Sequence, residues 1–171
     1  MKTANEWDRF ETLSKLEATA RDILVKACQQ KLMIATAESC TGGLVASLLT
    51  DIEGASCAFE RGFVVYTNEA KCELLDIEAE LIERHGAVSA ETAVAMARGA
   101  LRHSRADLVI AITGFAGPAG PHDEPGLVHF ACARRGQFLW CHEEHFGNIG
   151  RDAIRQRCLS VCLDMLQDAI A

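Results

Sequence analysis

A short loop of small polar residues carries the side chains best suited to bind a ligand. An apolar run over residues 32–37 gives way to Glu38-Ser39-Cys40-Thr41-Gly42-Gly43, and apolar residues resume at Leu44. This pattern predicts a strand, a tight loop and a helix start, where glycines let the backbone approach a ligand and the helix N-terminus attracts anions. The alternative is structural: a helix cap followed by small residues that allow close packing. Neither the Walker A nor the Rossmann glycine spacing is present. On the binding interpretation, a phosphate or carboxylate is held by Ser39, Thr41, Gly42 and Gly43.

A second loop, rich in glycine and proline, follows another apolar run. Leu108–Ile112 is apolar on both faces, which predicts a central strand in a sheet covered on both sides. The stretch over residues 113–126 is too long and too rich in turn formers for an ordinary connection, so we expect a binding loop that uses Thr113 and Gly114. Both loops follow strands, and in an open α/β sheet such loops can converge on one crevice at the carboxyl ends of the strands.

Cysteine and histidine offer two weaker candidates for chemistry. Cys40 could act as a nucleophile near a helix start, although a small packing residue is its more ordinary role. His142 and His145 could ligate a metal, but they fall on an expected strand, where side chains three positions apart face opposite ways. The eight cysteines contain no Cys-x-x-Cys pair and are expected to be reduced thiols. We expect no metal and no cofactor.

Alternating helical and strand patterns must position these residues. Helical periodicity, caps and turn residues predict helices over residues 7–30, 43–49, 68–75, 78–84, 89–103 and 150–170. Runs of β-branched, aromatic and other apolar residues predict strands over residues 32–37, 57–66, 108–112, 127–133 and 137–145. Asn68 is the expected N-cap of its helix, and Gly62 marks a bulge or a close approach in its strand. The order predicts an α/β fold: a layered α/β/α sandwich with a mixed, mainly parallel sheet, in a single domain over residues 1–171.

Composition and charge exclude several classes of protein. The chain has 171 residues, of which 49% are hydrophobic and 24% charged, so it can bury a core and is not disordered throughout. Its formal net charge of −7 disfavours nucleic acid as the main partner, because that partner needs a basic surface. No stretch approaches the roughly 20 apolar residues of a membrane span, and residues 1–7 lack the apolar segment of a signal peptide. We expect a cytoplasmic protein that does not bind membranes.

Four stretches in order resemble motifs of one known family. They are Thr36-Ala37-Glu38-Ser39-Cys40-Thr41-Gly42-Gly43, then Phe59-Glu60-Arg61-Gly62-Phe63-Val64-Val65-Tyr66-Thr67-Asn68-Glu69-Ala70-Lys71, then His85-Gly86-Ala87-Val88-Ser89, and Thr113-Gly114-Phe115-Ala116-Gly117-Pro118. The chain resembles the CinA C-terminal domain family from about Leu16 to Leu166. The resemblance implies the α/β fold and an amidohydrolase that converts nicotinamide mononucleotide (NMN) to nicotinate mononucleotide and ammonia. It also implies a role in pyridine nucleotide salvage and NAD biosynthesis, and a homodimer.

The resemblance further implies roles for individual residues. Ser56 matches the family's nucleophile, Tyr66 its tyrosine and Lys71 its catalytic lysine. Substrate binding is then expected from the first loop and from Asn68, Thr113, Gly114 and Arg151. Two departures from the usual pattern are a compacted segment over residues 118–125 and Phe115 in place of a smaller aliphatic residue.

These residue types suit the hydrolysis of an amide. A serine hydroxyl attacks a carbonyl when a neighbouring base takes its proton, and a lysine can be that base if burial lowers its pKa. Ser56 and Lys71 are therefore the expected dyad, with Tyr66 relaying a proton or holding the lysine. On sequence alone, the same three residues are also an ordinary turn serine, helix lysine and strand-end tyrosine. A cation at a helix N-terminus opposes the dipole, so Arg151 suggests an anionic ligand.

A different class of function stays open beside the enzyme. The domain could be a nucleotide-binding or regulatory module, linked to competence or DNA damage, that keeps the pocket without turnover. The presence of Ser56, Tyr66 and Lys71 favours the enzyme.

Overall fold

The five strands form one mixed sheet. A computed structural model describes residues 4–117, 120 and 123–171, with the backbone alone for residues 4–12. The sheet order is β2-β1-β3-β4-β5, and β1 pairs in parallel with both β2 and β3, whereas β4 is antiparallel to β3 and β5. Only β4 runs against the others, which confirms the mixed, mainly parallel sheet. The strands are β1 (Ile34–Glu38), β2 (Phe59–Val64), β3 (Leu108–Gly114), β4 (Leu127–Arg134) and β5 (Leu139–His145).

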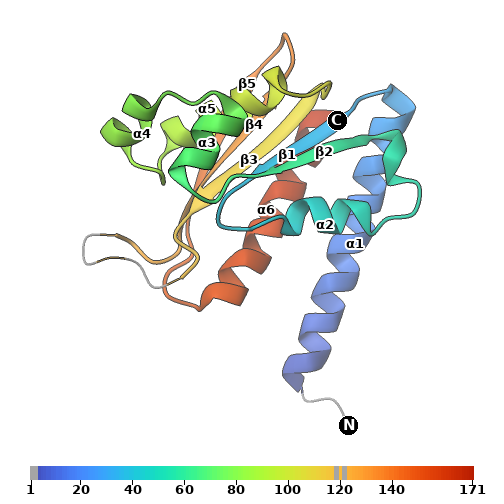
Figure 1. Cartoon of the computed structure of the whole chain (residues 1–171). Coiled ribbons are helices and arrows are strands. Elements are labelled where there is room, and N and C mark those ends of the chain that lie inside the picture. Colours follow the sequence, from blue (N-terminus) through green and yellow to red (C-terminus); the bar gives the residue numbers. More distant parts are fainter. Residues whose placement is uncertain (1–3, 118–119, 121–122) are drawn as a thin grey trace.

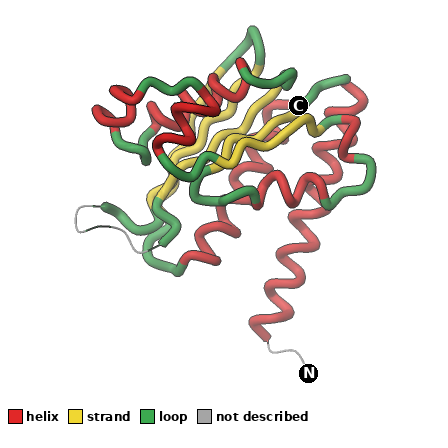
Figure 2. The backbone as a smooth tube through the Cα atoms, in the orientation of Figure 1, coloured by secondary structure: helices red, strands yellow, loops and turns green. Residues whose placement is uncertain are grey.

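Helices cover both faces of this sheet, as the sandwich prediction requires. On one face lie α1, α2 and α6, and on the other lie α3, α4 and α5 (Figures 1 and 2). A single 3-10 turn, η1, precedes β2. The bounds are α1 (Ala4–Gln30), α2 (Leu44–Thr50), η1 (Ala55–Cys57), α3 (Asn68–Leu75), α4 (Ala79–His85), α5 (Ala90–Arg102) and α6 (Arg151–Ile170).

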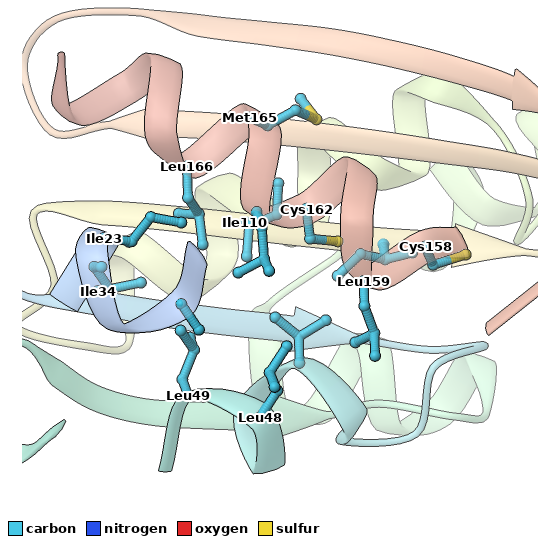
Figure 3. Close-up of a cluster of buried hydrophobic side chains, with 14 of the residues drawn as sticks. Ile23, Ile34, Leu48, Leu49, Ile110, Cys158, Leu159, Cys162, Met165 and Leu166 are labelled. Atoms are coloured by element: carbon cyan, nitrogen blue, oxygen red, sulfur yellow. The ribbon is translucent and has the colours of Figure 1, made fainter. Parts of the chain in front are cut away.

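Side-chain alternation along the central strands divides the core into two clusters. Ile34 and Ile110 point toward α1, α2 and α6, where they meet leucines and cysteines of the larger cluster (Figure 3). Ile112 belongs to the same cluster. Ala35 and Val109, one residue out of phase, pack on the other face against α3 and α5. The period of two puts neighbouring residues on opposite faces, so both faces of these strands are apolar.

Two local details differ from the predicted elements. The segment over residues 55–57 forms η1, and β2 begins only at Phe59. The ladder of β1 and β2 shifts register opposite Glu60, so the irregularity lies there and Gly62 marks a close approach: a Cβ on Gly62 would lie 2.9 Å from the Thr36 hydroxyl oxygen. Thr67, and not Asn68, is the N-cap of α3, because its hydroxyl accepts the N–H of Ala70.

The parallel strands bring three loops to one edge of the sheet. The carboxyl ends of β1, β2 and β3 lie together, so the loops over residues 39–43, 65–67 and 115–126 start from the same edge. Half of the segment over residues 118–125, for which a compaction was predicted, lies outside the described residues. In the part of the chain that the structure describes, none of the helices has the length and apolar character needed to span a membrane.

Candidate active site

A buried lysine and a serine meet at this edge of the sheet. Lys71, in the first turn of α3, is only 1% exposed. Its Nζ lies 3.1 Å from Ser39 Oγ and donates to the carbonyl oxygen of Val65 at 3.0 Å. A hydroxyl within hydrogen-bond distance of a buried amine is the arrangement of a nucleophile with its base.

Local sequence explains how two neighbouring strands deliver this pair. Ser39 directly follows β1 and is 8% exposed, and β2, beside β1, ends at Val64. Residues 65–67 connect β2 to α3, whose N-cap is Thr67, so Lys71 lies in the first turn of the helix that follows that strand. The serine and the lysine therefore come from the carboxyl ends of adjacent strands.

Burial changes the acid–base behaviour of Lys71. Loss of water around the ammonium group lowers the pKa of Lys71, and the thiols of Cys40 and Cys72 oppose this shift in part. A neutral amine can donate to the Val65 carbonyl while its lone pair accepts the Ser39 proton. Lys71 thus has the environment of a general base.

The N-terminus of α2 is already occupied by a carboxylate of the chain itself. Glu38 is fully buried, and its carboxylate accepts the N–H groups of Gly43 at 3.0 Å, Val45 at 3.1 Å and Ala46 at 2.8 Å. These are the donors that the glycine pattern assigned to a bound phosphate. That part of the prediction is wrong, because the anion at this helix N-terminus is Glu38. A buried acid must find donors, so an acid at the end of an apolar strand was the available signal.

Two other N–H groups of the loop remain free among the described residues. The N–H of Ser39 donates to Ile112 and that of Gly42 donates to the Ser39 carbonyl, whereas those of Cys40 and Thr41 have no hydrogen-bond partner there. They follow Ser39 directly, and an acyl-transfer site needs donors for a developing oxyanion next to its nucleophile.

Tyr66 and Arg151 lie together at the surface, where Tyr66 directly follows Val65, whose carbonyl accepts the Lys71 amine. Tyr66 is 59% exposed, and Arg151, the first residue of α6, places its Nη2 3.4 Å from the tyrosine hydroxyl. A Cβ on Gly117 would lie 3.3 Å from Arg151 Nη1, so the loop after β3 also borders this guanidinium. Arg151 therefore borders the loop after β3, and its expected part in substrate binding stays a prediction.

Arg155 is a further site residue that motif reasoning missed. It lies one turn after Arg151 in α6, and its Nη2 donates to the Thr41 carbonyl oxygen at 2.7 Å. A Cβ on Gly42 would lie 3.4 Å from the same nitrogen. The spacing of four residues was the available signal, because it puts both arginines on one helix face.

Of three other predicted binding residues, Thr113 and Gly114 have a role in the packing of the fold, and Asn68 lies at the surface. The buried hydroxyl of Thr113 donates to the carbonyl of Ala87 at 2.6 Å. A Cβ on Gly114 would come within 2.7 Å of Val128 Cγ2, so close strand packing accounts for this glycine. Asn68 is exposed in the first turn of α3 and lines a groove with residues of α3 and α4.

Ser56 does not meet Lys71 in this structure. Ser56 lies in η1, before the start of β2, whereas Lys71 follows the end of that strand. The six residues of β2, at about 3.3 Å each, put about 20 Å of extended chain between them. The predicted Ser56–Lys71 dyad is therefore not formed, and the serine beside Lys71 is Ser39.

Cys40 and the pair His142 and His145, the two weaker candidates for chemistry, also make contacts within the fold. Cys40 is 5% exposed, and a hydrogen bond from Cys158 on α6 lowers the pKa of its thiol, while burial opposes this shift. His142 pairs with Glu144 at 2.7 Å, and His145 pairs with Glu124 and Glu143 at 2.7 and 2.8 Å. Within the described ranges, these and the other His, Cys, Asp and Glu side chains form no group that could hold a metal ion.

Comparison of the chain with models of protein families identifies the domain that carries this site. The model described as the CinA C-terminal domain matches residues 16–170. The chain belongs to the CinA C-terminal domain family. The four CinA-like stretches meet around the site: the first contains Ser39, the second contains Tyr66 and Lys71, and Thr113 of the fourth bonds to Ala87 of the third.

Individual CinA relatives agree with this assignment. Nicotinamide-nucleotide amidohydrolase PncC of Shigella flexneri is 46% identical over 136 residues, 78% of this chain and 81% of the relative. A putative competence-damage inducible protein of Symbiobacterium thermophilum is 43% identical over 154 residues, 81% of this chain and 35% of the relative. The crystal structure of competence/damage inducible protein CihA of Agrobacterium tumefaciens has a TM-score of 0.87 at 45% identity and covers 91% of this chain and 94% of its own. The predicted family and fold are confirmed.

Proposed function

We propose that this CinA domain is a nicotinamide-nucleotide amidohydrolase that converts NMN to nicotinate mononucleotide and ammonia. The observation that carries the proposal is the 3.1 Å contact between Ser39 Oγ and the buried Nζ of Lys71. The identity of 46% to a relative named for this activity supports the choice of substrate. We also propose Ser39 as the nucleophile, in place of Ser56.

The first half of the reaction forms an acyl-enzyme. Neutral Lys71 takes the proton of Ser39 as the hydroxyl oxygen attacks the carboxamide carbon of NMN. The N–H groups of Cys40 and Thr41 donate to the resulting oxyanion. The carbon–nitrogen bond then breaks, and the leaving nitrogen takes the proton from protonated Lys71 to depart as ammonia.

The second half releases the product and restores the enzyme. Lys71, neutral again, takes a proton from water while the water oxygen attacks the Ser39 ester. The carbon–oxygen bond to Ser39 breaks, Lys71 returns the proton to the serine, and the carboxylic acid of nicotinate mononucleotide ionises in water. Tyr66 is placed to bind the substrate or to pass a proton at the open side of the site.

Binding of the phosphate falls to α6 in this proposal. The α2 N-terminus is filled by Glu38, whereas Arg151 extends an exposed guanidinium beside Tyr66 and Gly117. A phosphate at Arg151 forms charge-assisted hydrogen bonds and directs the carboxamide toward Ser39. Thr41, Gly42 and Gly114 shape the loops around the phosphate. Thr113 and Asn68 contribute to substrate binding without contacting the phosphate.

Cellular context is proposed on weaker grounds. The eight free cysteines suit a reducing compartment such as the cytoplasm. The homodimer and the role in pyridine nucleotide salvage rest on the family resemblance alone.

Ammonia release from NMN tests the reaction and the nucleophile together. We expect turnover by the wild type and a loss on the order of a thousandfold or more for Ser39→Ala. Ser56→Ala is the matched control, a serine-to-alanine change in the exposed η1 turn, and should keep wild-type turnover. Loss of activity in Ser56→Ala with activity kept in Ser39→Ala would show that Ser56 is the nucleophile, as first expected. A wild type that binds NMN without releasing ammonia would instead favour the regulatory module.

A further inference from the structure

An arginine of α6 holds the loop that follows the nucleophile, in addition to the hydrogen bond from Cys158 of α6 to Cys40. Arg155 is half-buried in α6, and its Nη2 donates to the carbonyl oxygen of Thr41 at 2.7 Å. The two residues are 114 positions apart in the chain. A hydrogen bond from a charged guanidinium is stronger than one between neutral groups, so this contact is a strong tie between α6 and the loop.

This tie fixes one peptide unit from both sides. The unit that joins Thr41 to Gly42 accepts Arg155 at its carbonyl, and its N–H donates to the carbonyl of Ser39 at 3.1 Å. A peptide unit is planar, so two hydrogen bonds to its opposite ends set its orientation. The N–H groups of Cys40 and Thr41 belong to the two peptide units that directly precede this one in the chain.

Glycine makes the loop dependent on such a tie. Gly42 has a φ of +61° and is exposed, and a residue without Cβ has access to many other backbone conformations. The Ser39 end is held by its bond to Ile112, and the Gly43 end by Glu38. Between them, two side chains of α6 contact the middle of the loop: Cys158 bonds to the Cys40 thiol, and Arg155 donates to the Thr41 backbone carbonyl.

We infer that Arg155 is a positioning residue of the proposed amidohydrolase: by holding the Thr41 carbonyl, it keeps the N–H groups of Cys40 and Thr41 directed at the oxyanion formed on attack by Ser39. The inference rests on the proposed function. Its role differs from that of Arg151, which is exposed and contacts the Tyr66 hydroxyl instead of a loop carbonyl.

Steady-state kinetics of Arg155→Met and Arg155→Lys with NMN test the inference. Loss of transition-state donors lowers kcat, so we expect Arg155→Met to reduce kcat about 100-fold with KM for NMN changed less than about threefold. The same fractional loss of kcat/KM should appear with nicotinamide riboside, which has no phosphate. Arg155→Lys can still donate one hydrogen bond and should recover part of kcat. Arg157→Met, on the exposed side of the same helix, is the matched control and should behave as wild type.

Other outcomes distinguish a failure of the Arg155 inference from a failure of the proposed function. If Arg155→Met raises KM for NMN and spares kcat, Arg155 binds phosphate and the positioning role is wrong. Unchanged kinetics would overturn it as well. Should Arg155→Met fail to give a cooperative melting transition, the comparison of Arg155→Lys with Arg157→Met decides by the same split between kcat and KM. A wild type that releases no ammonia would overturn the proposed function too, whereas an active wild type with insensitive Arg155 variants overturns this inference alone.

Discussion

At Lys71 the fold takes an amine out of water and gives it only neutral partners. Its Nζ contacts a serine hydroxyl and a backbone carbonyl, and the residue is 1% exposed. Burial without a carboxylate in contact favours the neutral amine, which is the form that can accept a proton from Ser39. In the proposed mechanism, the basicity needed at the site thus follows from desolvation of one side chain.

The lowered pKa of Lys71 should be visible in the pH dependence of turnover. We expect kcat/KM for NMN to rise with pH and to level off at a pKa below the ordinary lysine value of 10.5, because only neutral Lys71 serves as base. Initial rates across the pH range measure this limb, and Lys71→Met should abolish turnover. A limb with the ordinary lysine pKa would mean that Lys71 is not the base.

Protein stability gives an independent check on the same group. The fold favours the neutral amine, so between the lowered pKa and 10.5 the unfolded chain binds more protons than the folded one. The free energy of unfolding contributed by Lys71 therefore rises with pH across this window. Denaturant titrations of wild type and Lys71→Met measure this effect. The free energy of unfolding of wild type should rise relative to that of the variant as the pH increases through this window.

Arg151 should determine selectivity for the phosphorylated substrate. Arg151→Ala is expected to lower kcat/KM for NMN roughly a hundredfold, mainly through KM, if a charge-assisted phosphate contact of about 3 kcal/mol is lost. Kinetics of wild type and variant on NMN and on nicotinamide riboside measure the preference. If wild type hydrolyses the riboside as well as NMN, or if the variant weakens both substrates equally, Arg151 does not bind the phosphate.

At the scale of elements, the site depends on which end of a strand a residue follows. Residues 57–66 read as a strand from their aromatic and β-branched content, and Ser56 precedes that strand whereas Lys71 follows it. The predicted elements already separated the pair, and only the motif match joined them. Ser39 and Lys71 both follow parallel strands, and β1 and β2 are neighbours in the sheet, so their meeting required the strand order as well.

Helix α5 lies against α3 through a glycine. A Cβ on Gly99 would lie within van der Waals overlap of the Leu75 carbonyl oxygen and 2.7 Å from Leu75 Cβ. Alanine is the better helix former by about 1 kcal/mol, but here the overlap should dominate, and we expect Gly99→Ala to destabilise the fold by about 1–3 kcal/mol. Denaturant unfolding measures this change.

A second variant in α5 separates packing from helix propensity. Ala95→Gly, at a half-buried position of the same helix, should cost about 1 kcal/mol from propensity alone. An increase in stability for Gly99→Ala would show that α3 yields easily and that the close contact is not required.

At the scale of the whole molecule, periodicity and turn residues were sufficient to predict most of the fold. The α/β class, the covered central strand and the late hairpin all follow from apolar patterns that the two clusters confirm. The side-chain hydrogen bonds that shape the loop were not predictable in this way. Glu38 turns back on the next helix, and Arg155 reaches the loop from 114 residues away, and neither contact has a periodic signature.

The carboxylate of Glu38 caps α2 permanently, because it is covalently part of the same chain. Its carboxylate is joined to the helix it caps by only a few residues, so its effective concentration at those N–H groups far exceeds that of any anion in solution. Sulfate or inorganic phosphate in a buffer therefore has no means of competing for α2. Inhibition by such anions, where it occurs, should act through the exposed guanidinium at the start of α6 and should compete with the substrate.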